Sequence, residues 1–144
     1  MTARRYPPKG PEIRFKTTAP PAVLYGEFFE PGPAALVRAF ALEAPPTKGG
    51  VVVVTSVYRK PGSKPSYHPE LEAVDVRTGV DDTRLVGSIL GRTRADRYAK
   101  AEAWAERVRK RLGSEFDIIY GEASRHVDHI HGEWDRRKRR LSVV

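Results

Sequence analysis

The sequence has no cysteine among its 144 residues. Disulfides and thiolate metal sites are therefore excluded, and any bound metal must be held by nitrogen and oxygen ligands. No run approaches the roughly 18 consecutive apolar residues of a membrane-spanning helix. The N-terminal residues, MTARRYPPKGPEIRF, contain no apolar segment of the kind that an export signal needs. These absences predict a soluble protein that is synthesised in the cytoplasm without an export signal.

Proline is absent from the second half of the chain, because all 12 prolines lie at or before Pro69. The first half is therefore expected to hold short elements joined by stiff loops, and the second half more regular structure. The length suits one domain, 1–144, and no linker or internal repeat divides it.

Hydrophobic patterns predict both strands and helices. A helix is expected over 94–112, with Thr93 as N-cap, Asp96 as the capping acid and Gly113 as the stop. Its predicted apolar stripe consists of Tyr98, Ala101, Ala105, Val108 and Leu112. A short helix is expected over 34–42, a loop over 60–69, and strands over 22–29, 51–58, 72–77, 116–120 and 127–134. This combination predicts an α+β domain.

The formal net charge is +8, from 26 basic and 18 acidic residues. Part of the excess lies in a basic tail, 135–144, which contains the run Arg136, Arg137, Lys138, Arg139 and Arg140. A basic surface attracts anionic partners such as a cell envelope, acidic lipid or nucleic acid. Charge alone does not choose among these polyanions.

The four histidines occur in two places, His68 alone and three others within six residues, His126, His129 and His131. Two imidazoles and a carboxylate form a catalytic zinc site with one position left for water, and a nearby carboxylate can then accept the water proton. The sequence has no serine-nucleophile elbow, phosphate-binding glycine loop or His-Glu-x-x-His helix. Alternation along a strand places His129 and His131 on one face and Asp128 on the other, unless a bulge or the strand end turns one of them.

The segment Ser66-Tyr67-His68-Pro69-Glu70-Leu71-Glu72-Ala73-Val74-Asp75 resembles the motif Ser-x-His-x-x-Gly-x-Ala-x-Asp of zinc D-Ala-D-Ala carboxypeptidases and dipeptidases. That family includes phage L-alanyl-D-glutamate endolysins and shares its fold with the hedgehog signalling domain. Ser, His, Ala and Asp match at the family spacing, whereas Leu71 stands where the family has glycine.

Two further segments carry the resemblance, which covers about 51–134. Asp128-His129-Ile130-His131 is similar to the second family motif, an acid three residues before the last histidine ligand, and is followed by Glu133-Trp134. Thr55-Ser56-Val57-Tyr58-Arg59 looks like the Ser-Gly-Tyr-Arg strand end of the family.

The resemblance implies one zinc ion per chain, with His68, Asp75 and His131 as metal ligands and Asp128 as general base. Arg59 is expected to assist catalysis and bind substrate, together with Ser66, His129 and Trp134. Glu122 and Glu133 are the alternative bases. The implied fold is a small, mainly antiparallel sheet with flanking helices.

The implied activity is hydrolysis of a peptide bond in the peptidoglycan stem or cross-link, by an endolysin or a D,D- or L,D-type peptidase. Such an endolysin would act at the cell wall, to which its basic surface would draw it.

Two rival functions stay open. A non-catalytic zinc-binding module of the same fold would act at an envelope or in a virion through its basic surface. A metal-dependent nuclease of the ββα-metal type would use Val127-Asp128-His129-Ile130. That nuclease motif requires a following helix with another histidine or asparagine ligand, and the 13 residues after His131 contain neither.

Overall fold

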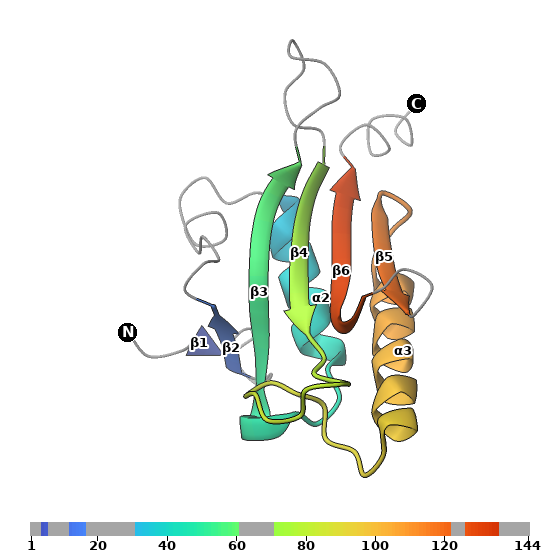
Figure 1. The fold of residues 1–144 in the computed structure, drawn as a ribbon. Helices are drawn as coiled ribbons and strands as arrows, with labels where there is room; N and C mark the ends of the chain where they lie inside the picture. The colour runs from blue at the N-terminus through green and yellow to red at the C-terminus, as the bar shows by residue number, and fades with distance from the viewer. Residues whose placement is uncertain (1–3, 6–11, 17–30, 61–70, 122–125, 136–144) are drawn as a thin grey trace.

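In the computed structural model, which describes residues 4–5, 12–16, 31–60, 71–121 and 126–135, the strands form one mixed sheet (Figure 1). Their order is β1-β2-β3-β4-β6-β5. Neighbouring strands are antiparallel except β2 and β3, which are parallel. The strands are β1 Arg4–Arg5, β2 Glu12–Phe15, β3 Val51–Lys60, β4 Leu71–Arg77, β5 Phe116–Gly121 and β6 His126–Asp135.

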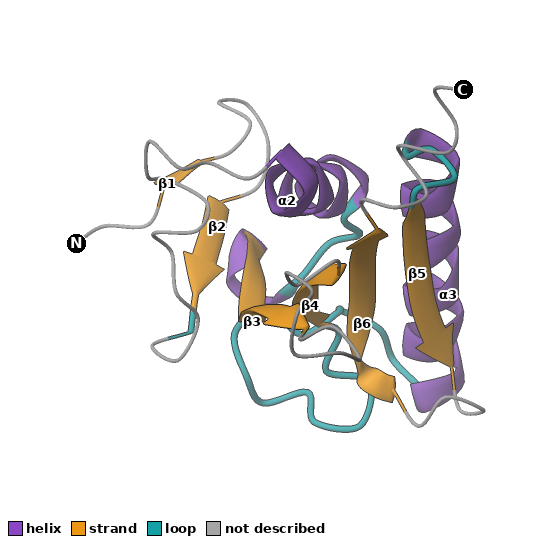
Figure 2. Cartoon of the chain, turned by 90° about the horizontal axis from the view of Figure 1, so that it is seen from above, coloured by secondary structure: helices purple, strands orange, loops and turns teal. Residues whose placement is uncertain are grey.

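The helices α2 (Pro31–Glu43) and α3 (Arg94–Arg111) supply the apolar cover of the sheet. Helix α2 contacts β3, β4 and β6, and α3 runs beside β5 (Figures 1 and 2). A short 3-10 turn, η1 (Lys48–Gly50), leads from α2 into β3. We call the side of the sheet covered by the helices the helix face, and the other side the polar face.

Strand β3 begins with four valines that are all buried. Val52 and Val54 belong to the main core, whereas the alternate residues Val51 and Val53 point to the polar face. On that face the loop 78–93 covers the start of β3, and a Cβ added to Gly87 would lie 2.7 Å from Val53 Cγ2. Burial on both sides explains why this stretch is continuously apolar rather than alternating.

Helix α3 begins as the sequence predicts, because the Thr93 hydroxyl accepts a hydrogen bond from the Asp96 backbone N–H (3.0 Å). The predicted apolar stripe is confirmed but omits Trp104, which is fully buried in the core. The predicted stop residue, Gly113, is not the C-cap of the helix, because Leu112 takes that position. The helix ends at Arg111 with Leu112 already extended (φ −98°, ψ 161°), and Gly113 accepts a turn hydrogen bond from the Phe116 N–H.

Trp104 is a buried side chain that joins the two helices. Its indole Nε1 donates to the Phe40 carbonyl (3.0 Å), and the two rings meet edge to face at 5.9 Å. Trp104→Phe is expected to lower the free energy of unfolding by about 2–4 kcal/mol, because it leaves a buried carbonyl unpaired and a cavity beside it. Denaturant unfolding measures this loss. The exposed Lys110→Ala on the same helix should change stability by less than about 0.5 kcal/mol, and an equal loss in both variants would contradict the assignment.

The structure confirms a single α+β domain with a mainly antiparallel sheet and flanking helices. The helix expected at 34–42 is α2, and the strands expected at 51–58, 72–77, 116–120 and 127–134 are β3, β4, β5 and β6. The expected strand 22–29 lies outside the described residues, as do most of the loop 60–69 and the basic run 136–140. Neither of the described helices is long and apolar enough to cross a membrane.

Candidate metal centre

The candidate site lies on the polar face, where β4 and β6 pair. Val74 and Val76 of β4 point into the core, so Asp75 and Arg77 point to the polar face. On β6, Ile130 and Trp134 are core residues, so His129, His131 and Glu133 share the polar face. The register places Asp75 opposite His131 and Arg77 opposite His129. Two motif residues 56 positions apart are thereby brought side by side.

The centre consists of four side chains in one hydrogen-bonded chain. His131 Nδ1 lies 2.7 Å from Asp75 Oδ1, and His131 Nε2 lies 2.8 Å from Glu133 Oε1. The Ser56 hydroxyl donates to the other oxygen of Asp75, Oδ2, at 2.9 Å. Ser56 reaches Asp75 because the β3–β4 register shifts between Val54 and Ser56. His131 is only 7% exposed, so its ring is held on both sides in a largely dry setting.

The charges of Asp75 and His131 stabilise each other. Burial alone would raise the pKa of Asp75, but hydrogen bonds from His131 and Ser56 and the nearby imidazole charge hold that pKa below its usual value. Burial alone would lower the pKa of His131, but hydrogen bonds to Asp75 and Glu133 and their charges raise it. The two carboxylates therefore shift the imidazole toward its protonated form.

The donor chemistry of this pair fits zinc. An imidazole nitrogen and a carboxylate oxygen that already meet are two of the three ligand types in a catalytic zinc site. Histidines that ligate metals almost always donate their other ring N–H to a carboxylate or carbonyl, and Glu133 occupies that place. Among the described residues, no three histidine, aspartate or glutamate side chains are placed to hold a metal. The predicted third ligand, His68, lies outside the described residues.

Asp128 lies just beyond the regular part of the site. The β4–β6 ladder ends at the pair Arg77 and His129. Against β5 the register breaks, because Ile119 pairs with His131 but Gly121 pairs with His126. Strand alternation is therefore not enforced at Asp128. Its carboxylate Oδ1 accepts a hydrogen bond from the Asp81 backbone N–H (2.8 Å), and the described part of the chain offers its Oδ2 no partner.

The remaining predicted residues have different placements. His129 is half-buried on the polar face; its pKa is lowered by burial, against which Asp75 and Asp128 act, while Arg77 and Lys16 lower it further. The backbone of Arg59 pairs with Glu72 in β3 and β4, and its side chain is not described. Ser66 lies outside the described residues.

Trp134 lies on the other side of the sheet from the metal centre. It is 5% exposed and packs in the core on the helix face. A Cβ on Gly32 would lie 2.0 Å from its ring. Trp134 therefore packs in the core under the site, and its role in binding substrate stays a prediction.

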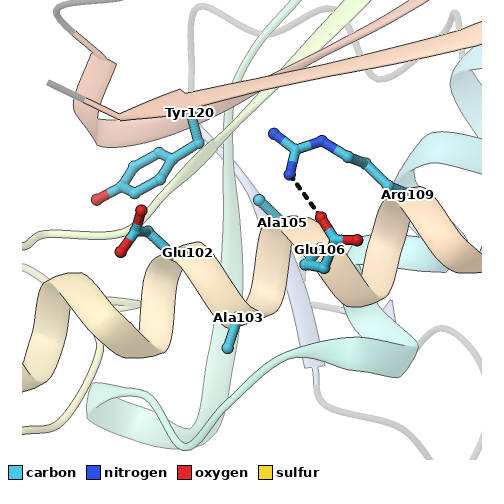
Figure 3. Close-up of a pocket in the computed structure, with 6 residues that line it drawn as sticks. All are labelled: Glu102, Ala103, Ala105, Glu106, Arg109 and Tyr120. Carbon is cyan, nitrogen blue, oxygen red and sulfur yellow. Dashed lines mark hydrogen bonds and ion pairs between the residues drawn. The ribbon is translucent and has the colours of Figure 1, made fainter. Parts of the chain in front are cut away.

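Two hollows flank β5. One, of about 340 Å³, lies between α3 and β5, where Glu102, Glu106 and Arg109 face Tyr120 (Figure 3). It has no lining residue in common with the metal centre. The other, of about 510 Å³, runs along the β5 edge and includes Ile119 and Glu133 in its lining. Because Ile119 is opposite His131 and Glu133 contacts the His131 ring, this second hollow adjoins the centre.

No contact of Ser56 was predicted from the sequence, and Glu133 was predicted only as an alternative base. The period of two in His129, His131 and Glu133 is a signal that could have placed Glu133 beside the ligand face. No comparable signal exists for Ser56, because its contact with Asp75 depends on the bulge in β3.

Comparisons of this chain with known protein families, with curated proteins and with solved structures found no match.

Proposed function

We propose that this protein is a zinc-dependent peptidase that hydrolyses a peptide bond in the peptidoglycan stem or cross-link. The observation that carries the proposal is the meeting of Asp75 Oδ1 and His131 Nδ1 at 2.7 Å, with the far nitrogen of the ring held by Glu133. Both ligands come from motif positions, and the fold that brings them together has the class that the family resemblance implies.

Each residue of the site has a distinct proposed task. Asp75, His131 and His68 hold zinc, which when bound supplies Lewis acidity toward a peptide carbonyl and lowers the pKa of water to about 7. Ser56 fixes one oxygen of Asp75, and Glu133 fixes the tautomer and orientation of His131. The β5-edge hollow, next to Glu133, offers room for one side of the substrate.

Asp128 is the proposed general base, accepting the proton of the attacking water on Oδ2. Glu133 is less suited to that role because its carboxylate lies on the Nε2 side of the ring, away from Asp75. The hydrogen bond from the Asp81 N–H to Oδ1 holds the Asp128 carboxylate at the start of β6. His129 and Arg59 are proposed to bind substrate.

The test of the proposed function is mass spectrometry of products formed from defined muropeptides with added zinc. One specific bond should be cleaved, and a chelator should stop the reaction until zinc is restored. The same preparation is assayed for metal-dependent nicking of plasmid DNA. Zinc binding without cleavage of any muropeptide would favour the non-catalytic module, and nicking would favour the nuclease.

Glu133→Gln is expected to weaken zinc affinity by about 10–100-fold, the usual effect of losing the carboxylate that orients a ligating histidine. Competition with a chromophoric chelator measures the affinity without relying on turnover. Glu106→Gln, an exposed glutamate on α3, is the control and should bind zinc like the parent protein. Unchanged affinity in Glu133→Gln would remove Glu133 from the centre.

A further inference from the structure

The polar face carries a second set of basic side chains, formed by Lys16 at the end of β2, Arg77 on β4 and His129 on β6. Arg77 is directly opposite His129 in the β4–β6 register, two residues along each strand from Asp75 and His131. Ile13 and Phe15 of β2 pack toward the core, so Lys16, which follows them, projects to the polar face. Its backbone N–H is fixed by the Val54 carbonyl (2.9 Å).

Within the described part of the chain neither Lys16 nor Arg77 forms an ion pair with a carboxylate. Arg77 Nη1 donates to the Val86 carbonyl (2.8 Å), which orients the guanidinium, and its other donors have no partner among the described residues. Asp82, whose pKa the charge of Arg77 helps to lower, already forms an ion pair with Arg84 (Nε to Oδ1, 3.1 Å).

We infer that Lys16 and Arg77 form a binding subsite for a carboxylate of the peptide substrate, with Arg77 next to the metal centre on β4 and Lys16 on the other side of β3. This inference rests on the proposed function for the position of the cleaved bond. Two residues along a strand span about 7 Å, so the carboxylate belongs to a group about two residues from that bond in an extended peptide. Arginine suits the task because its fork of donors matches a carboxylate. Neither cation belongs to the motif positions that carry the family resemblance.

The test compares two forms of one muropeptide stem, one with free carboxylates and one with those carboxylates amidated. Binding of each form is measured by NMR titration at low salt, independently of turnover. The parent protein is expected to bind the free form about 10-fold more tightly, since two partly exposed charge contacts contribute roughly 0.5–1 kcal/mol each. This preference should fall to about threefold in Lys16→Ala and in Arg77→Gln, and to near one in the double variant. Added salt should weaken the preference in the parent protein.

The controls are Lys110→Ala and Arg92→Gln, which remove exposed charges elsewhere and should keep the full preference. Arg77→Lys retains the charge but not the fork, so it should show an intermediate preference. Equal binding of the two stem forms by the parent protein, binding of neither form, or a full preference in the double variant would overturn the subsite. Muropeptide cleavage is scored separately. A carboxylate preference without cleavage would therefore leave the subsite standing while the proposed function fails.

Discussion

His131→Ala is expected to lose both zinc and peptidase activity. The variant removes a ligand, and two protein ligands seldom hold catalytic zinc. Stoichiometry should fall from one zinc per chain to near zero, and muropeptide cleavage should fall to the uncatalysed background. Zinc content and hydrolysis are measured on the same preparation.

The substitution also leaves Asp75 and Glu133 without the imidazole that separates their charges. His131→Gln keeps a polar side chain in that place and guards against loss of folding as the cause, with circular dichroism and thermal unfolding as the check. His129→Ala, on the same face of β6, should retain zinc. Full zinc occupancy in His131→Gln, or loss of zinc in His129→Ala with a native fold, would contradict the ligand assignment.

Asp128→Asn is expected to retain zinc and lose turnover by about 10²–10⁴-fold, the usual contribution of positioned acid–base catalysis. The amide oxygen of asparagine can still accept the hydrogen bond from the Asp81 N–H, so the start of β6 should keep its structure. The substitution thus removes the basic group and little else. Steady-state kinetics on a defined muropeptide, with zinc content measured in parallel, gives the result.

Asp96→Asn, in the first turn of α3, is the control and should keep near-parental turnover. Parental turnover in Asp128→Asn would transfer the role of base to Glu122 or Glu133. Loss of zinc in Asp128→Asn would instead make Asp128 a ligand.

Local patterns were sufficient to predict α2, α3 and the strands β3 to β6, but they did not predict β1 and β2. The capping of α3 by Thr93 depends on neighbouring residues only, so it could be read directly. The β-branched run at 51–54 predicted a buried strand for the same reason. The proximity of Asp75 and His131 was expected only through the motif resemblance, because pairing between strands is not encoded at any fixed spacing.

The tertiary structure decided the surroundings of the ligands. Glu133 became the partner of His131 because β6 is regular against β4 from His129 onward, so that alternation holds there. Trp134 became a core residue because α2 brings Gly32 against its ring, a contact that no local pattern specifies.

The cationic pair shows the same division between sequence and tertiary structure. Lys16 and Arg77 are 61 positions apart in the sequence. They belong to one sheet because β2 pairs in parallel with the edge of β3 that is opposite β4. The sequence by itself determined α2, α3, the strands β3 to β6 and the side chains that are proposed to bind zinc. Sheet order and register, which depend on packing between distant segments, decided which of those side chains meet.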